Sequence, residues 1–202
     1  MNIHPTAEVE DGVLIGEGTA VWSDVHIRRG AVIGRDCIVG EKTYIAGDVV
    51  IADRVKINAM VYLCAGVTLD TGVMVSAGVV FTNDRYPRAT TPDLSELRTS
   101  DVDEHTLPTR VREGATIGAR AMVGAGLEVG RFALVGMGAV VTKTVPDFHL
   151  VVGNPARSVA VVCRCGQPVL RFASGQKSMV DATCPECGRA YRVEGRAVTE
   201  IS

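Results

Sequence analysis

An aliphatic or aromatic side chain returns at every sixth position from Ile3 to Phe81 without interruption. This spacing is neither the 3.6 residues of an α-helix nor the two residues of a β-strand, so the segment is an internal repeat. A small or β-branched residue stands four positions after each member, and glycine or aspartate is common three positions after it. The column consists of Ile3, Val9, Ile15, Val21, Ile27, Ile33, Val39, Ile45, Ile51, Ile57, Leu63, Leu69, Val75 and Phe81.

Each six-residue unit can form a short strand followed by a tight corner. The column residue and its companion four positions later would face inward, and the residue between them would occupy the corner. Glycine and aspartate suit a corner because they accept a positive φ more readily than other residues. Three units, about 18 residues, would close one triangular coil, and stacked coils would bury the shared column. We therefore predict an all-β triangular prism of roughly six to seven coils. An ordinary β-sandwich would not explain the constant spacing.

The repeat stops after Phe81, and residues 84–110 form a long loop by composition. Pro87, Pro92 and Pro108 fall in this segment together with many Ser, Thr and Asp residues. The column resumes in phase at Val111, so the loop leaves one corner of the prism and returns to it. Long loops in compact domains are often lids or binding segments, although a tolerated surface insertion is the alternative.

The second block of repeats extends the prism to about residue 162. Its column ends at Val141, and Pro146 breaks the pattern five residues later. We expect residues 1–162 to form the β-helix domain. The column of this block is Val111, Ile117, Val123, Val129, Val135 and Val141.

Residues 163–202 differ in composition and contain two cysteine pairs. Cys163 and Cys165 form the first pair, and Cys184 and Cys187 form the second, each followed by glycine. Four thiolates without a histidine are typical of a structural zinc site, so we predict a small module that resembles a zinc ribbon. The first pair is one residue shorter than the usual spacing, and four free cysteines are the alternative.

Composition excludes several classes of function. The net charge of −2 gives no attraction to nucleic acid or to an anionic membrane surface. The start of the sequence has no basic segment followed by an apolar one, and no apolar run is long enough to cross a bilayer. We expect a cytoplasmic protein without nucleic-acid or membrane partners. Aromatic residues are only 4% of the chain, so aliphatic side chains must build the core.

The whole pattern resembles the hexapeptide repeat of left-handed parallel β-helix proteins, and that resemblance implies the left-handed coil. The segment GATIGARAMVGAGLEVGRFALVGMGAVVTKTVPDFHLVVGNPAR is similar to the terminal coils of acyl-CoA-dependent hexapeptide acyltransferases. Those enzymes are trimers that bind the coenzyme between neighbouring subunits. The resemblance implies that Lys143 and Arg157 bind the coenzyme phosphates. The residues implied to line the coenzyme arm or its exit are Gly136, Gly138, Ala139, Pro155 and Ala156.

A narrower resemblance concerns the segment VVFTNDRYPRA and the opening HPTAEVEDGVLIGEGTAVWSDVHI. Both are similar to bacterial N-acetyltransferases that acetylate amino sugars carried on UDP or dTDP, often at C3. The resemblance implies acetyl transfer from acetyl-CoA in the synthesis of surface polysaccharide precursors, with Asn83 as the catalytic residue that orients the sugar. Arg88 would bind a carboxylate or phosphate of the substrate, and Asp84 is the nearby carboxylate that could collect the proton.

The sequence leaves open the identity of the general base and two alternative functions. His26 is the best alternative general base and a candidate substrate contact, whereas His105 and His149 have no spacing that suggests catalysis. The first coils also resemble γ-type carbonic anhydrases, but the three histidines that such a zinc site needs are missing from the later coils. A non-catalytic trimeric scaffold is the third possibility.

Overall fold

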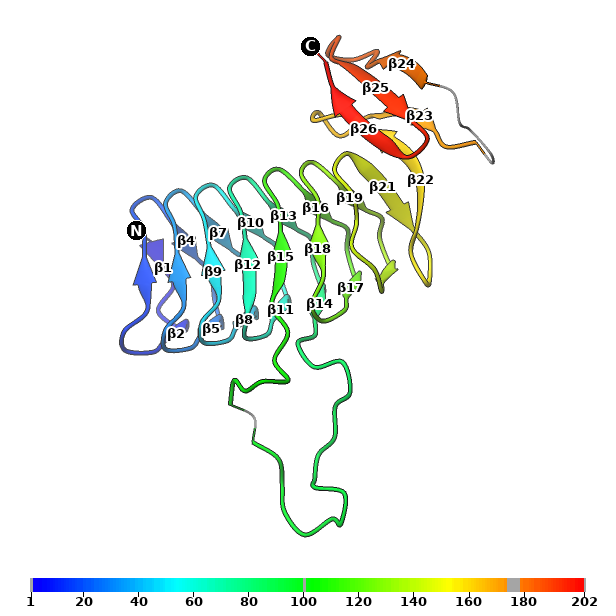
Figure 1. Cartoon of the computed structure of the whole chain (residues 1–202). Coiled ribbons are helices and arrows are strands. Elements are labelled where there is room, and N and C mark those ends of the chain that lie inside the picture. The colour runs from blue at the N-terminus through cyan, green and yellow to red at the C-terminus, as the bar shows by residue number, and fades with distance from the viewer. Residues whose placement is uncertain (1, 100, 174–178, 202) are drawn as a thin grey trace.

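The computed structural model describes residues 2–99, 101–173 and 179–201. Its main body is a prism of stacked coils, from which a long loop extends at one corner and a small β module at the C-terminal end (Figure 1). The described residues contain strands and turns but no α-helix, and therefore no helix that could span a bilayer.

Three sheets form the sides of the prism, and each consecutive strand belongs to the next sheet. Neighbouring strands within each side are parallel and 18 residues apart, except across the long loop and at the last parallel pair of the first side, where Leu134 pairs with Leu150. The first side contains β1 (Asn2–Ile3), β4 (Ala20–Val21), β7 (Ile38–Val39), β10 (Lys56–Ile57), β13 (Met74–Val75), β16 (Thr116–Ile117), β19 (Leu134–Val135) and β21 (His149–Val152). The second contains β2 (Glu8–Val9), β5 (His26–Ile27), β8 (Tyr44–Ile45), β11 (Tyr62–Leu63), β14 (Val80–Phe81), β17 (Met122–Val123) and β20 (Val140–Val141). The third contains β3 (Leu14–Ile15), β6 (Val32–Ile33), β9 (Val50–Ile51), β12 (Val67–Leu69), β15 (Thr109–Val111) and β18 (Glu128–Val129).

The predicted triangular prism is confirmed, and its coils follow the six-residue period. Strands β1 to β20 trace seven coils, the last closed on the third side by the bridge from Val129 to Val145, and β21 begins an eighth. From Val21 onward, the column residues and their companions four positions later are almost fully buried within the coils, except Leu127, which is partly buried. Ile3 is 38% exposed, in the strand at the edge of the first sheet.

The corners have the backbone conformation that the sequence predicted. Gly12, Gly18 and Asp24 at successive corner positions all have positive φ. The same conformation occurs at Lys42 and Met60, where the residue type gave no indication of it. The repeat thus imposes the left-handed conformation even on residues that disfavour it.

The prism ends in a second, antiparallel arrangement. β22 (Arg157–Val162) pairs with β21, and β23 (Pro168–Arg171) pairs with β22, so the first sheet continues through the residue 162 boundary without a break. The module is completed by a three-stranded sheet of β24 (Met179–Thr183), β25 (Ala190–Glu194) and β26 (Ala197–Glu200).

A second apolar cluster joins this module to the last coils. Tyr191 and Val193 of the module are fully buried against Phe148, which stacks on Phe132 of the preceding coil. This shared apolar cluster therefore anchors the module to the end of the prism.

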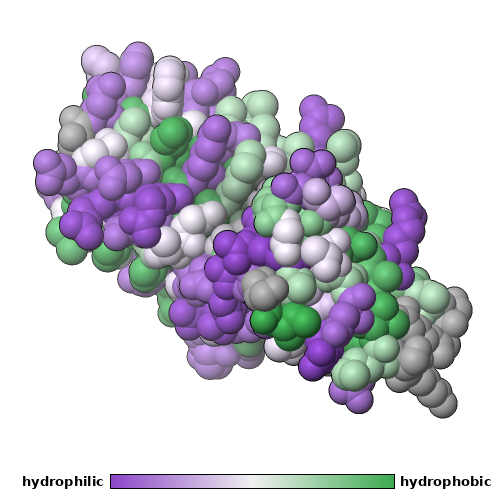
Figure 2. Space-filling view, turned by 90° about the horizontal axis from the view of Figure 1, so that it is seen from above, coloured by the Kyte–Doolittle hydropathy of each residue, from purple (hydrophilic) through white to green (hydrophobic). Residues whose placement is uncertain are grey.

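On the face seen from above, hydrophilic side chains are interspersed with hydrophobic patches (Figure 2).

Candidate active site

The long loop leaves the prism after β14 and returns at β15, and its two ends face each other. The backbone carbonyl of Asn83 accepts a hydrogen bond from the amide of Leu107 at 2.8 Å. This bond fastens the outgoing strand to the returning one. Residues on either side of it are consequently brought together although they are far apart in sequence.

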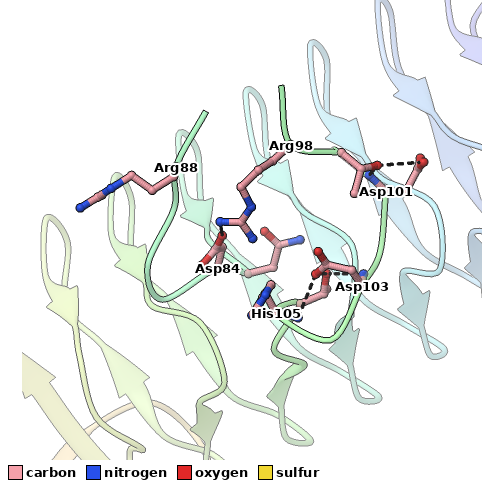
Figure 3. A pocket seen from close by; sticks show the side chains of 9 residues that line it. Asp84, Arg88, Arg98, Asp101, Asp103 and His105 are labelled. Carbon is pink, nitrogen blue, oxygen red and sulfur yellow. Dashed lines mark hydrogen bonds and ion pairs between the residues drawn. The ribbon is translucent and has the colours of Figure 1, made fainter. Parts of the chain in front are cut away.

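A polar cavity of about 120 Å³ lies between these two limbs of the loop (Figure 3). Carboxylates, guanidinium groups, hydroxyls and one imidazole surround it. The residues that line it are Asn83, Asp84, Arg88, Arg98, Thr99, Asp101, Asp103, His105 and Thr106.

Asn83 is held at the corner between the second and third sides of the prism. Its side-chain Nδ2 donates to the carbonyl of Ala65, one coil below, at 3.4 Å. No described residue occupies its Oδ1, which leaves a neutral acceptor beside the cavity. An amide cannot take a proton at neutral pH, so Asn83 can orient a donor but cannot act as a base.

Asp84 and Arg98 form the charged side of the cavity. Asp84 Oδ1 accepts the backbone N–H of Tyr86 at 2.7 Å, and Oδ2 lies 4.0 Å from Arg98 Nη1. Arg88 also borders the cavity, but its side chain points away from the other labelled residues and donates to the carbonyl of Pro87 (Figure 3). Arg98, and not Arg88, therefore projects toward Asp84.

The sequence did not indicate His105, which the loop brings into the same cavity. Its imidazole is 58% exposed, and its Nε2 lies 3.9 Å from Glu104 Oε1. The backbone amide of His105 donates to Asp103 Oδ1 at 2.8 Å, which shapes the turn that presents the ring. Its place two residues before Leu107 was a usable signal, because a loop that returns to its own corner must bring its two ends together.

His26 lies elsewhere, on the outer face of β5. Its Nε2 is 3.1 Å from Glu10 Oε1, and its ring meets Tyr44 edge-on at 5.4 Å. Three coils separate β5 from β14 on the same side, a distance of roughly 14 Å at the usual strand spacing. His26 borders instead the region of a second cavity of about 440 Å³, which includes Arg28, Arg29 and Tyr44.

The predicted coenzyme residues are divided between two places in one chain. Lys143, Ala156 and Arg157 line a groove of about 310 Å³ at the end of the prism. Gly136 and Gly138 lie at the corner between the first and second sides, where Gly138 is exposed and a Cβ added to it would have no atom within 4 Å. Ala139 itself is fully buried in the core and has no exposed surface.

One corner of the prism links the two candidate regions. The register of β14, β17 and β20 places Asn83, Ala125 and Lys143 at equivalent positions of three consecutive coils. Asn83 and Lys143 are therefore about 10 Å apart along the prism axis at the usual strand spacing. Between Asn83 and Lys143, this corner carries only the small residues Gly124, Ala125 and Gly126.

Comparison with known proteins agrees with this architecture. Residues 12–47 match the family described as bacterial transferase hexapeptide (six repeats). The match covers 36 of the 202 residues, so it describes this segment and not the whole chain. Outside the repeat, the evidence comes from individual relatives.

Two curated relatives are similar in sequence to part of this chain. A dTDP-3-amino-3,6-dideoxy-α-D-galactopyranose 3-N-acetyltransferase of Aneurinibacillus thermoaerophilus is 40% identical over 93 residues, which are 46% of this chain and 45% of that protein. A serine acetyltransferase of Haemophilus influenzae is 43% identical over 51 residues, 25% of this chain and 19% of that protein. The chain thus spans less than half the length of these relatives.

A solved structure resembles the hexapeptide-repeat chain over a greater length. A mutant of an N-acyltransferase from Bacillus cereus, solved in complex with dTDP and coenzyme A, matches with a TM-score of 0.54 over 80% of this chain and 81% of that one. The sequence identity is 15%, so this likeness supports the fold alone.

The cysteines of the C-terminal module converge as the sequence predicted. The Sγ atoms of Cys163, Cys165, Cys184 and Cys187 all lie within 4.8 Å of one another. Among the described residues of the hexapeptide-repeat chain, no other group of three or more His, Cys, Asp or Glu side chains is arranged to hold a metal. Nothing in those residues favours a three-histidine zinc site like that of the γ-type carbonic anhydrases.

Proposed function

We propose that the chain is an N-acetyltransferase that moves an acetyl group from acetyl-CoA to the amine of a nucleotide-linked amino sugar. The observation that carries the proposal is the corner that aligns the Asn83 cavity with the cationic groove at Lys143. A thin coenzyme arm could follow the small residues of that corner from one to the other. The relative from Aneurinibacillus thermoaerophilus supports the 3-amino group of a dTDP-linked sugar as the acceptor.

The cavity provides what an amine needs to attack a thioester. The Oδ1 of Asn83 accepts a hydrogen bond from an N–H of the substrate amine. This bond directs the lone pair of the amine nitrogen at the acyl carbon. The C–N bond forms as the carbonyl becomes an oxyanion, and collapse of this intermediate breaks the C–S bond. The thiolate leaves as coenzyme A, and the proton lost by the amine passes to that thiolate through solvent or through His105.

His105 has a more favourable chemistry for this proton than Asp84. A neutral imidazole has a free nitrogen lone pair that can take a proton, and histidine is the side chain most often used for general acid–base catalysis. The Asp84 carboxylate also accepts the Tyr86 amide and faces Arg98. We therefore assign Asp84 and Arg98 to substrate binding, and the proton-accepting role to His105. Arg88 borders the cavity but would have to turn its side chain inward to bind the substrate.

The second cavity, beside His26, is suited to the nucleotide carrier. It shares Asp101 with the Asn83 cavity and includes Arg28, Arg29 and Tyr44. Arginine side chains can bind a diphosphate, and tyrosine can stack on a base. Arg28 already donates to the Tyr44 hydroxyl at 3.1 Å and pairs with Glu10, so it is fixed in position for this role.

The split of the coenzyme residues supports a homotrimer with sites between subunits. Lys143 lies at one corner of the prism, whereas Gly136 and Gly138 lie at another. An arm that contacts both corners must lie between two chains. We infer that Gly136, Gly138 and Pro155 act on the coenzyme held by a neighbouring subunit, whereas the buried Ala139 only supports the corner from inside.

The four cysteines are suited to a structural zinc ion. The Sγ atoms of Cys163 and Cys187 are 3.3 Å apart, and those of Cys165 and Cys184 are 3.6 Å apart. Four sulfurs about 2.3 Å from a tetrahedral zinc would be separated by roughly 3.8 Å, close to these values. The metal would hold the two turns together and would take no part in acyl transfer.

The environment of Cys163 favours the thiolate that a metal requires. Burial raises the pKa of its thiol, but hydrogen bonds from the Tyr191 hydroxyl, the Cys165 amide and neighbouring thiols outweigh burial and lower the pKa to about 7. The Tyr191 hydroxyl donates to Cys163 Sγ at 3.0 Å. Metal analysis of the purified protein should find about one zinc per chain, and well under one would remove this assignment.

The enzymatic proposal is tested by release of free thiol from acetyl-CoA. The purified chain is incubated with UDP- and dTDP-linked sugars that carry amines at C3 or C4, with the corresponding hydroxyl sugars as controls. We expect turnover with a 3-amino sugar. Absence of turnover on every sugar, together with absence of acetyl-CoA binding, would leave the non-catalytic trimeric scaffold as the better explanation.

A further inference from the structure

The groove at the end of the prism receives a cationic side chain from the C-terminal module. Arg196 lies in the turn between β25 and β26 and lines the same groove as Lys143 and Arg157. The hexapeptide repeat gives no reason for this residue, because it belongs to the cysteine-containing module. The module therefore takes part in shaping the groove and does not only close the end of the prism.

Arg196 is held in place by contacts with β21, β22 and the segment after β23. Its Nη1 donates to the carbonyl of Ser158 at 3.0 Å, and its guanidinium lies 4.9 Å from the centre of the Phe172 ring. Its own carbonyl oxygen is 2.8 Å from Nε2 of His149. These contacts fix both the backbone and the side chain of Arg196.

His149 acts as the link between the last coil and this turn. The ring is 1% exposed, and its Nδ1 is 2.8 Å from the hydroxyl of Ser158. A carbonyl can only accept, so Nε2 carries the hydrogen and Nδ1 accepts from Ser158. Burial lowers the pKa of His149, which keeps this neutral arrangement at physiological pH.

The charge in the groove is of one sign. Lys143, Arg157 and Arg196 line it, and no aspartate or glutamate is among its described lining residues. The nearby Asp147 instead accepts the backbone amide of Arg131 at 2.7 Å. Of the five N–H groups of the Arg196 guanidinium, the protein uses one, to Ser158, within the described chain. The others are free to bind an anion.

We propose that Arg196 completes a three-cation site, with Lys143 and Arg157, for the phosphate groups of coenzyme A. This rests on the proposed acetyltransferase function and extends it, because it makes the cysteine-containing module part of the coenzyme site. Loss of the fold of that module would then weaken coenzyme binding without altering the Asn83 cavity. The phosphates of the nucleotide sugar share the same chemistry, and the experiment separates the two sources.

The test is calorimetric titration of the full-length, metal-loaded protein and of Arg196→Gln. Coenzyme A, its 3′-dephospho form, pantetheine and dTDP are titrated in parallel. We expect Arg196→Gln to weaken coenzyme A binding by about tenfold, the usual size of a lost charge-assisted hydrogen bond. Pantetheine, which has no phosphate, should bind both proteins equally. A tenfold effect that disappears with dephospho-coenzyme A would place Arg196 at the 3′-phosphate.

Arg171→Gln is the matched control, because Arg171 is an exposed arginine at the end of β23 that does not line the groove. It should bind coenzyme A like the unaltered protein. Metal content is measured for each variant, and Arg196→Lys, which keeps the charge, should recover part of the affinity. Removal of the metal with a chelator should reproduce the loss seen with Arg196→Gln.

The outcomes distinguish this inference from the function on which it rests. Equal coenzyme A affinity in Arg196→Gln and the unaltered protein would overturn the role of Arg196 and leave the acetyltransferase intact. A loss seen for dTDP but not for coenzyme A would assign the site to the nucleotide and also overturn the proposal. If the unaltered protein bound neither coenzyme A nor dTDP, both the inference and the proposed function would fail.

Discussion

In the proposed acetyl transfer, Asn83 orients the substrate amine as a neutral hydrogen-bond acceptor and does not act as a base. Its Nδ2 is committed to the carbonyl of Ala65, so the amide cannot rotate freely and Oδ1 keeps one direction. That orientation is set by the preceding coil and not by the other side chains of the cavity. The residue should therefore contribute to the positioning of the substrate amine and little to coenzyme binding.

Replacement of Asn83 by alanine tests this assignment. We expect kcat/KM for the amino sugar to fall by about 10²- to 10³-fold, because the acceptor that orients the amine is lost. The affinity for coenzyme A, measured by titration, should change less than twofold. Asn83→Asp is the matched variant, because it keeps an oxygen acceptor and should retain more activity than alanine. Equal loss of turnover and of coenzyme affinity would mean that the two sites are wrongly separated.

Much of the residue-level pattern could be read from the sequence, and the failures have identifiable causes. The column positions, the corner glycines and the two cysteine pairs all repeat or cluster locally, so spacing alone reveals them. His105 and Arg98 lie in a segment without periodicity, and only the tertiary closure of the loop brings them to Asp84. Arg196 reaches the groove through the fold of the module, which the sequence pattern does not describe.

At the scale of the element, the coils are held together by the close approach of one corner to the next. Gly118 illustrates this, because a Cβ there would lie 2.6 Å from the backbone nitrogen of Met137. Gly138, at the same corner in the next coil, has a positive φ, and a Cβ added to it would have no atom within 4 Å. The two glycines are thus required for different reasons, one for space and one for backbone conformation.

Gly118→Ala should destabilise the prism more than Gly138→Asn. The added methyl group must push apart two coils whose backbones cannot yield, at a cost of about 1–3 kcal/mol or more. Asparagine tolerates the left-handed conformation, so the second change should cost well under about 1 kcal/mol. Thermal unfolding followed by circular dichroism should show a Tm lower by roughly 3–10 °C for Gly118→Ala alone. Similar Tm values for both variants would show that neighbouring coils move apart easily at this corner.

The contact between the last coil and the C-terminal module should depend on pH through His149. Burial lowers the pKa of this group in the folded state, so the unfolded chain binds the proton more tightly. The contribution of His149 to stability is therefore complete above its ordinary pKa of about 6.5 and is lost as pH falls below that value. His149→Gln removes the titrating group while keeping a polar side chain.

The measurement is the difference in Tm between the unaltered protein and His149→Gln from about pH 7.5 to about pH 5, a range that spans the ordinary pKa of histidine. We expect the unaltered protein to be more stable at the upper end and this advantage to shrink as the pH falls. Protonation of the cysteines affects both proteins alike and cancels in the difference. A constant difference across the range would show that His149 does not link the module to the prism by a neutral ring.

At the scale of the whole molecule, the prism keeps two functional regions at a fixed separation. Asn83 and Lys143 lie on one corner, and Gly136 and Gly138 lie on another, so in the proposed arrangement one coenzyme arm contacts two subunits. In a trimer whose threefold axis is parallel to the prisms, the corner of Gly136 and Gly138 in one subunit would lie beside the corner of Asn83 and Lys143 in the next. Three copies of the 21.4-kDa chain should then sediment as a species of about 64 kDa.

Subunit mixing tests whether the sites are shared. Asn83→Ala disables the first corner, and Gly138→Trp, at the exposed second corner, blocks the second with a bulky ring. Each variant alone should be inactive, but a co-refolded equal mixture should recover about a quarter of the unaltered activity, because a quarter of the random pairings join two intact corners. Sedimentation of each variant verifies that Gly138→Trp still assembles. An assembled mixture without activity would place the complete site within one chain, because only then does every site contain one of the two defects.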